Sequence, residues 1–385
     1  MPTSTSDLWN AMLASVLRDE WIEIEAIYRA VQSQVALQPD DYEPSALGNT
    51  DPTWHRNVRN VLQKRKTSDI LWERRGLYYF PSQIGNRTSL IAAERELRER
   101  WWQEILDAGG PKGLRPDLLR HIGIYGGQQG IWVDKQRTIH LSSSEQGATV
   151  AILHTGLHYP DDLAEDGVIY HYPNTCRPES RDINEIAATK ISAELQLPVF
   201  VVTMSSRGST FRDVYIGWVE GWDDSSRLFL VTFGSIAPST LLTSPIDDIP
   251  FSLTEIRHQT IAQASTRHGQ SRFRFQVMQR YGQECAVCGI SVPELLEAFH
   301  IRPVSERGSD DARNGLILCA NHHRAFDAGL FAINPAGYPI VTLDPALRAS
   351  DLGLSTPDLS HLRLKPHGHA VLWHWNLASS SRGNS

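Results

Sequence analysis

The apolar residues near the N-terminus recur first with a helical period and then with the period of short strands. The helical spacing is followed by Leu8, Met12, Val16, Trp21, Ile24, Ile27 and Val31. Another helical run begins at Thr53, and the segment ILWERRGLYYFP then contains two short β-runs around an Arg-Arg-Gly turn. This succession predicts a winged helix-turn-helix domain over residues 1–85.

The second predicted helix and the turn that follows it are basic. Between Thr53 and Arg75 the chain has seven Lys or Arg residues and two acidic residues. Such a surface can lie along DNA phosphates, and the residues expected to contact the DNA backbone are Lys64, Arg65, Arg74 and Arg75. The alternative is a solvated face on a small protein-interaction domain.

The middle of the chain is richest in β-runs. Residues 86–114 are expected to form a connector, because residues 88–108 are typical of one helix with mixed charges. Residues 115–240 then contain the apolar runs TVAILHT, GVIYHYP, LPVFVVTM, DVYIGWVEGWD and LFLVTF, with one helical segment, DINEIAATKISAEL, among them. This pattern predicts a mixed, mostly β domain that could close into a small barrel.

The last third of the chain begins with a change of composition. Residues 241–264 are rich in Pro, Ser and Thr and are expected to be a linker. Residues 265–385 begin with a basic helix in which Arg272 and Arg274 are expected to follow the DNA backbone. Near the C-terminus, YPIVTL and HAVLWHWN are expected to be strands. The predicted fold class is therefore α+β with several domains.

Composition narrows the possible classes of protein. The chain has 385 residues, of which 41% are apolar and 21% charged, as in ordinary globular proteins. No apolar run reaches the length of a membrane span, and the N-terminus lacks the features of a secretory signal. The pattern of four cysteines, with Cys176 apart from the others, indicates a reducing cytoplasm. The net charge of −7 implies that any DNA contact comes from local basic surfaces.

A metal-ligand pattern stands out between residues 281 and 331. Cys285 and Cys288 form a C-x-x-C pair, and Cys319 and His322 form a C-x-x-H pair. Three thiolates and one imidazole are a donor set that a closed tetrahedral zinc site uses. We therefore predict a structural Zn²⁺ at these four residues. The same pattern could also be no more than an isolated zinc knuckle.

A second pattern, interleaved with the first, suggests phosphodiester chemistry. His300 ends an apolar segment, Asn314 lies in the turn-like RNGLIL, and His323 lies in the helix-compatible CANHHRAFD. An imidazole at the end of a strand can take a proton from water near neutral pH. Hydrolysis of a phosphodiester also needs charge neutralisation on the phosphate, which a metal ion can supply.

The order His300, Asn314, His323 resembles the HNH endonuclease family, whose core is a β-hairpin and a helix around one catalytic metal ion. The resemblance implies that His300 is the general base, and that Asn314 holds the metal loop and can bind the ion. It also implies that His323 binds the catalytic Mg²⁺ or Mn²⁺. His322 could exchange roles with His323, but the C-x-x-H spacing favours His322 as the zinc ligand.

This sequence departs from the family pattern at Phe299, where many members carry a metal-binding Asp, Glu or His. We expect a water molecule or a carboxylate, that of Asp327 or Glu297, to complete the coordination of the ion.

The segment GATVAILHTGLHYPDDLAEDGVIYHYPNT resembles the SRA domain, a PUA-like barrel that binds modified cytosine in DNA. The resemblance implies that Tyr159 and Tyr172 stack on a flipped base and that Asp162, or failing it Asp161, accepts a hydrogen bond from the cytosine amine. The alternative is that both tyrosines belong to the barrel core.

Taken together, these patterns predict a modification-dependent restriction endonuclease with an SRA-like reader and an HNH nuclease. Its expected partner is double-stranded DNA with 5-methyl- or 5-hydroxymethylcytosine. A homodimer is expected because one HNH site cuts one strand. Two alternatives stay open: an HNH enzyme that reads another modification or a plain sequence, and a non-catalytic DNA-binding regulator.

Overall fold

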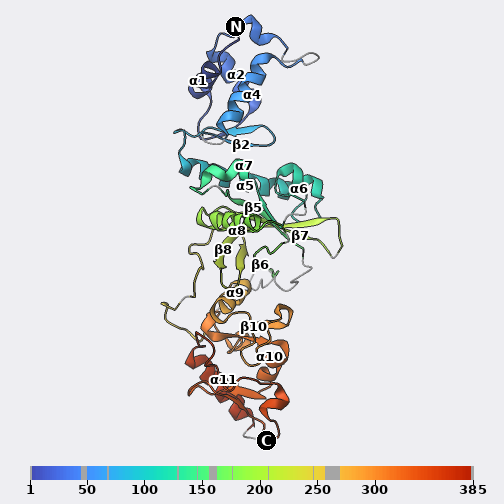
Figure 1. Ribbon diagram of the computed structural model, residues 1–385, viewed down its shortest axis with the longest axis vertical. Helices are drawn as coiled ribbons and strands as arrows, with labels where there is room; N and C mark the ends of the chain where they lie inside the picture. Colours follow the sequence, from blue (N-terminus) through green and yellow to red (C-terminus); the bar gives the residue numbers. More distant parts are fainter. Residues whose placement is uncertain are drawn as a thin grey trace. The chain divides into compact units, whose positions relative to one another are not determined.

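The computed structural model describes residues 2–44, 50–66, 69–127, 130–144, 146–155, 163–175, 177–206, 208–245, 247–255 and 269–382. The chain divides into two compact units (Figure 1). The first comprises residues 1–154 and 173–216, and the second comprises residues 155–172 and 217–385. Within the described residues, every helix is too short or too polar to cross a bilayer.

The first unit begins with a helical subdomain and a small sheet. Its helices are α1 (Thr5–Ser15), α2 (Ile24–Gln34), α3 (Pro39–Tyr42) and α4 (Thr53–Arg65). Its strands β1 (Trp21–Glu23), β2 (Leu71–Glu73) and β3 (Leu77–Tyr79) form an antiparallel sheet in the order β1-β3-β2. The predicted helix at Thr53 and the two strands around the Arg-Arg-Gly turn are confirmed. The assignment to the winged-helix class stays a prediction.

One long helix follows this subdomain. The predicted helix over residues 88–108 is confirmed as α5 (Arg87–Asp107), and its role as a connector stays a prediction. It is followed by α6 (Pro116–Ile122), α7 (Lys135–Thr138) and the 3₁₀ turn η1 (Ile139–Leu141). Glu94 and Arg98 of α5 are fully buried and form an ion pair, and Glu94 also pairs with Arg137. Burying these charges is possible because each carboxylate oxygen of Glu94 meets a guanidinium group.

A six-stranded mixed sheet occupies the middle of the chain, in the order β4-β5-β7-β8-β9-β6. Its strands are β4 (Ile131–Val133), β5 (Thr149–His154), β6 (Gly167–His171), β7 (Val199–Met204), β8 (Arg212–Asp223) and β9 (Leu228–Phe233). All five predicted apolar runs are strands, and the predicted helix between them is α8 (Glu179–Glu194).

The predicted barrel closure is not found among the described residues, where β4 and β6 are the two edges of the sheet. Among the same residues no strand pairing joins β4 to β6, and the inner pair of β5 with β7 is parallel. A parallel pair needs a long crossover connection, usually with a helix, rather than the tight hairpins of a meander. The chain between β5 and β7 contains α8. The result is a mixed α/β sheet.

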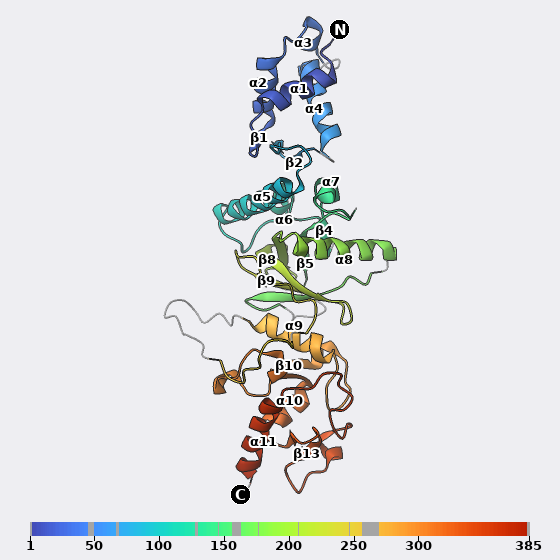
Figure 2. The ribbon, with the colours of Figure 1, turned by 90° about the vertical axis from the view of Figure 1, so that its left-hand side faces the viewer.

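The second unit also contains the C-terminal region of the chain (Figure 2). Its helices are α9 (Gln270–Tyr281), α10 (Ala320–Asp327) and α11 (Gly368–Arg382), and its strand pairs are β10 (Leu296–His300) with β11 (Gly315–Cys319) and β12 (Phe331–Ile333) with β13 (Ile340–Thr342). Short 3₁₀ turns join them: η3 (Pro293–Leu295), η4 (Val304–Glu306), η5 (Ala312–Asn314) and η6 (Ala349–Leu352).

One hydrophobic core runs through this unit. Helix α9 packs on β10 and β11 with one side and on β6 and β9 with another, and Figure 2 shows it between these strands. Phe273 and Phe275 of α9 are therefore in the same buried cluster as Ile169 of β6 and Leu230 of β9. The N-terminus of α9 is held by Asp166, whose carboxylate accepts hydrogen bonds from Gly269 N at 2.7 Å and Ser271 Oγ at 2.8 Å.

The prediction that HAVLWHWN is a strand is wrong, because these residues form part of α11. The buried residues of α11 include Ala370, Val371, His374 and Ala378, which follow a helical period and not an alternating one. This face packs on β12, and the ring of His374 stacks on Phe326 at 3.6 Å between centroids. The predicted strand in YPIVTL is confirmed as β13.

Candidate active site and zinc cluster

The four predicted zinc ligands come together in the structure. The donor atoms of Cys285, Cys288, Cys319 and His322 all lie within 4.8 Å of one another. The Sγ atoms of Cys288 and Cys319 are 4.0 Å apart, and His322 Nδ1 lies 3.6 Å from Cys285 Sγ and 3.1 Å from Cys319 Sγ. Tetrahedral Zn²⁺ with ordinary Zn–S and Zn–N bonds would need separations of about 3.8 Å and about 3.5 Å. The donor set and its size therefore fit zinc.

Two further contacts support a metal at this cluster. The Nε2 atom of His322 lies 2.9 Å from the carbonyl oxygen of Leu352, so that nitrogen carries the proton and Nδ1 is left for a metal ion. Burial and the neighbouring thiols Cys285 and Cys319 raise the pKa of the Cys288 thiol to about 12. A bound divalent cation would reverse that effect and keep the sulfur atoms as thiolates.

Strands β10 and β11 and helix α10 form the predicted hairpin-helix unit. His300 is the last residue of β10 and pairs with Gly315, the first residue of β11. A side chain at Gly315 would collide with Val277 and Phe273 of α9, at 2.6 and 2.8 Å from an added Cβ atom. Glycine at this position therefore allows α9 to lie directly against the end of the hairpin.

The His300 ring is held on two sides. It stacks on Phe273 of α9 at 3.7 Å between centroids, with only 4° between the ring planes. Its Nε2 atom lies 2.8 Å from Oδ1 of Asp310. Asp310 is not among the residues predicted from the sequence. The available signal was the Asp-Asp pair within the chain between His300 and Asn314, which must return to β11.

Asn314 is fully buried, and its amide joins the two ends of the loop between β10 and β11. Its Oδ1 atom accepts from Arg302 N at 3.0 Å, and its Nδ2 atom donates to the carbonyl oxygens of Arg302 at 3.1 Å and Ser309 at 2.9 Å. These contacts give Asn314 the geometry of a loop clamp. Binding of the ion by Asn314 stays a prediction.

His323 projects from α10 between two carboxylates. Its Nδ1 atom lies 2.5 Å from Glu297 of β10, and its Nε2 atom lies 3.4 Å from Asp327, one helical turn further on. Phe299 is buried, and its ring lies 4.7 Å from that of His323. Two ligands bound to one ion at about 2.1–2.2 Å are roughly 3.0–3.5 Å apart at angles of 90–110°. The separation of Asp327 and His323 Nε2 therefore fits a shared Mg²⁺ or Mn²⁺.

Comparison with known proteins agrees with this geometry. Residues 285–334 match the family model described as HNH endonuclease. The matched segment includes His300, Asn314, His323 and the zinc cluster. The chain carries an HNH endonuclease domain.

Two solved structures are similar to larger parts of the chain, whereas no curated protein matches it. One is described as the modification-dependent TagI restriction endonuclease, with 20% identity, a TM-score of 0.26, and coverage of 70% of this chain and 93% of that one. The other is described as the type IV phosphorothioation-dependent restriction endonuclease ScoMcrA, with 13% identity, a TM-score of 0.29, and coverage of 83% and 78%.

Of the three residues predicted to form the base pocket, Tyr159 and Asp162 lie outside the described residues, as does Asp161. Tyr172 is buried, and its ring lies 4.4 Å from that of Phe229. Its hydroxyl donates to Asp224 at 2.9 Å, and burial together with that carboxylate raises the pKa of Tyr172. The ring is packed against the sheet with little of its surface exposed, and its stacking on a base stays a prediction.

The predicted DNA-backbone residues differ in their surroundings. Lys64 is exposed, whereas Arg65 pairs with Asp69 at 2.8 Å and Arg74 lies 3.7 Å from Asp134. Arg75 pairs with both Glu73 and Glu104, Arg272 pairs with Glu220 at 2.7 Å, and Arg274 is partly buried on α9. Partners for four of these arginines lessen the positive charge that they offer to phosphate. Contact with the DNA backbone stays a prediction for all six.

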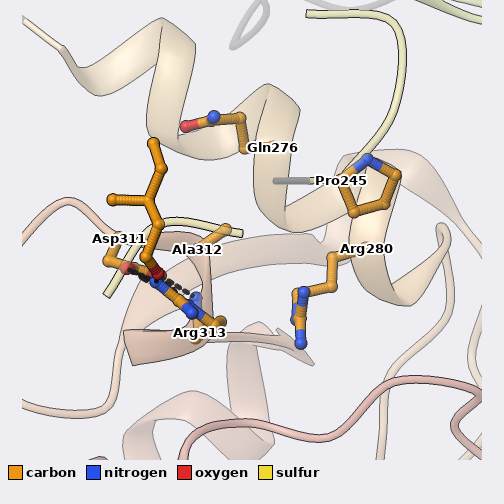
Figure 3. Close-up of a pocket in the computed structure, with 7 residues that line it drawn as sticks. Pro245, Gln276, Arg280, Asp311, Ala312 and Arg313 are labelled. Carbon is orange, nitrogen blue, oxygen red and sulfur yellow. Dashed lines mark hydrogen bonds and ion pairs between the residues drawn. The ribbon is translucent and has the colours of Figure 1, made fainter. Parts of the chain in front are cut away.

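A cavity of about 170 Å³ lies beside η5 (Figure 3). Arg280 and Arg313 face it from α9 and η5, but each is paired with a carboxylate, Asp247 at 2.6 Å and Asp311 at 2.6 Å. Arg313 also donates to the carbonyl oxygen of Ile249 at 2.8 Å. Because both arginine charges are balanced by carboxylates, we do not assign the cavity as an anion site. Pro245 and Ile249 line it together with residues of α9 and η5.

Proposed function

We propose that the protein is a modification-dependent restriction endonuclease that binds double-stranded DNA with 5-methyl- or 5-hydroxymethylcytosine and hydrolyses its phosphodiester bonds. The nuclease activity in this proposal is supported by the hairpin-helix unit, which presents His300 and His323 around the loop held by Asn314. The match of residues 285–334 to HNH endonucleases supports the same assignment.

His300 acts as the general base in this proposal. A carboxylate has no proton to donate, so the hydrogen bond between His300 and Asp310 places the ring proton on Nε2 and leaves Nδ1 as an acceptor. Nδ1 then takes the proton of the water molecule that attacks phosphorus. The side chain is only 19% exposed, which limits its contact with bulk water.

In this proposal His323 and Asp327 hold Mg²⁺ or Mn²⁺. Asp327 takes the place of the metal-binding residue that many family members carry at the position of Phe299. Glu297 accepts a hydrogen bond from His323 Nδ1–H, which would leave Nε2 as the atom that binds the ion. The ion, when bound, neutralises the scissile phosphate and stabilises the leaving 3′ oxygen. The zinc cluster has a structural role, and two protomers together cut both strands.

The reader half rests on the resemblance of residues 147–175 to the SRA domain. Tyr159 and Tyr172 would stack on a flipped cytosine, and Asp162 would accept from its exocyclic amine. A flipped base loses its stacking in the duplex, and aromatic side chains can replace it. The basic residues of α4, the turn after it and α9 would add contacts that do not depend on sequence.

The test is digestion of two plasmids of identical sequence, with and without cytosine methylation, in Mg²⁺ or Mn²⁺. The proposal expects cleavage of the methylated plasmid only, and none with a chelator. Equal cleavage of both plasmids would contradict the reader half. No cleavage of either plasmid, by protein that binds the methylated one, would contradict the nuclease half.

Binding of the base is tested separately with the His300→Ala protein, which should not cut. Tyr159→Ala and Tyr172→Ala should each lower affinity for a methylated duplex by roughly 5- to 150-fold, from the loss of about 1–3 kcal/mol of stacking. Affinity for the unmethylated duplex should hardly change. Tyr172→Phe is the matched control, because it keeps the ring and removes only the hydrogen bond to Asp224. Equal affinity of wild-type protein for both duplexes would exclude the pocket.

A further inference from the structure

The loop between β10 and β11 carries a carboxylate directly onto the proposed base. Asp310 Oδ1 lies 2.8 Å from His300 Nε2, and the two residues are far enough apart in sequence that a loop must fold back to join them. Both side chains are partly buried, 19% exposed for His300 and 30% for Asp310. A hydrogen bond to an ionised group in such a place is stronger than one between neutral groups.

The backbone on both sides of Asp310 is fixed by other contacts. Ser309 donates through its hydroxyl to Ser252 at 2.6 Å and accepts at its carbonyl from Asn314 at 2.9 Å. Asp311 accepts from Arg313 N at 2.8 Å and so caps the turn η5. Gly308 allows the loop to close, since a Cβ atom there would lie 1.8 Å from the carbonyl oxygen of Arg302. The position of the Asp310 carboxylate is thus set by the loop.

Stacking fixes the plane of the His300 ring. Phe273 covers one face of the ring with nearly parallel planes, which limits rotation about the side-chain bonds. Asp310 then decides which nitrogen faces the loop and which faces away from it. The charge of the carboxylate also stabilises the imidazolium ion that forms when Nδ1 accepts a proton from water.

We propose that Asp310 is the positioning residue of the nuclease: it fixes the tautomer and orientation of His300 so that Nδ1 is the atom that takes the proton. This inference rests on the proposed function, in which His300 is the general base. In this scheme Asp310 contacts neither the phosphate nor the metal ion, and it acts on the reaction through His300. The clamp of Asn314 contributes by holding Ser309, the neighbour of Asp310.

The experiment compares cleavage rates of full-length variants on the methylated plasmid in Mn²⁺, with DNA affinity measured in the absence of metal. Asp310→Asn should lower the maximal cleavage rate by about 10-fold to about 10⁴-fold, the range known for outer-shell partners and for the triad Asp. Its DNA affinity and melting temperature should stay close to wild type. Asp311→Asn is the matched control on the same loop, and should cut at near the wild-type rate because asparagine also caps helical turns.

The decisive measurement is the double variant. In the His300→Ala background, Asp310→Asn should change the residual rate by less than about twofold, because residues that act as one unit are not additive. A further fall comparable to that in the wild-type background would mean that Asp310 acts by another route and would overturn the inference. Equal losses for Asp310→Asn and Asp311→Asn would also overturn it, since the effect would then belong to the loop as a whole.

Failure of this inference can be told apart from failure of the proposed function. If His300→Ala cuts like wild type, the assignment of the base is wrong. If His300→Ala is inactive while Asp310→Asn cuts within about twofold of wild type, only the role of Asp310 is wrong. Should Asp310→Asn fail to fold, Asp310→Ser removes the same carboxylate with a smaller side chain and is judged by the same rates.

Discussion

At the scale of single residues, the environment of His300 explains why a histidine at the end of a strand can act as a base. The ring is stacked on Phe273, and one of its nitrogen atoms is hydrogen-bonded to Asp310. A histidine on an open surface would sample many orientations and only rarely point a nitrogen at the attacking water.

Replacement of the base tests this view. His300→Ala should lower the cleavage rate by about 10²- to 10⁴-fold and leave DNA affinity unchanged, because it removes a proton acceptor and no phosphate contact. His361→Ala, at an exposed histidine of the same unit, is the control and should cut normally. Cleavage by the His300→Ala protein at the wild-type rate would show that another group takes the proton.

The residues of the site differ in how far the sequence could reveal them. The zinc ligands and the His-Asn-His set were visible because each follows a fixed local spacing. Asp310 was not, because its role depends on the path of a loop that returns to β11, and no local pattern encodes that path. The contact of Glu297 with His323 joins β10 to α10, and was named only as one of several carboxylates that could complete the ion site.

At the scale of elements, α11 shows where periodicity can mislead. HAVLWHWN is a short apolar run, and such runs fit a buried strand and a buried helix face equally well. Packing on β12 and Phe326 decides in favour of the helix. Five of the six strands of the middle sheet were easier to predict, because β-branched and aromatic residues recur in them, whereas the short β4 was not predicted. Whether that sheet closes depends on long-range pairing, which local patterns do not fix.

The buried histidine of α11 makes stability depend on pH. Burial lowers the pKa of His374 to about 4, and its Nε2–H donates to the carbonyl oxygen of Phe326 at 3.2 Å. The neutral form is thus favoured by folding, so the stabilisation is complete above about pH 6.5 and is lost as the pH falls toward 4. A shift of this size corresponds to about 3 kcal/mol.

Chemical denaturation at pH 7 and pH 4.5 should therefore show a smaller loss of stability for His374→Gln than for wild type. The variant cannot gain a proton at this position, although it can still donate a hydrogen bond to Phe326. An identical loss in both proteins would mean that other groups carry the acid sensitivity.

The zinc cluster should hold the hairpin-helix unit together. Purified protein should contain about one zinc per chain, and Cys285→Ser should lose the metal and unfold the nuclease region, because three elements meet at the cluster. Cys176→Ser is the control and should keep both metal and fold. Metal-free protein that still cuts DNA would contradict a structural zinc.

At the scale of the whole molecule, the second unit does not follow the order of the sequence. It takes residues 155–172 from the middle of the chain and joins them to residues 217–385. The sequence predicted a boundary at residues 241–264 from composition alone, and that boundary stays a prediction. The core described here includes residues from both sides of it, since Leu228 and Leu230 pack in one cluster with Phe273 and Phe275.

Expression of fragments would measure how far the regions before and after the predicted linker depend on each other for stability. A fragment of residues 265–385 should be less stable than the same region in the full chain, because removing β6 and β9 exposes the side of α9 that they cover. Protease resistance of the region in both contexts is the readout. The comparison needs zinc in both samples. A fragment as resistant as the full chain would show that the shared core contributes little.

The attachment of Asp166 to the start of α9 has a consequence for engineering new specificities. One way to change the specificity of a restriction enzyme is to divide its gene at the linker and to join the nuclease to a different recognition module. In this chain such a fusion would remove the Asp166 carboxylate, which accepts hydrogen bonds from Gly269 and Ser271. It would also remove β6 and β9, which pack on α9. Helix α9, whose Phe273 stacks on His300, would then lose the contacts that hold it in place. A functional chimera should therefore retain residues 163–171 and 217–233 with the nuclease, and exchange only the recognition residues outside them.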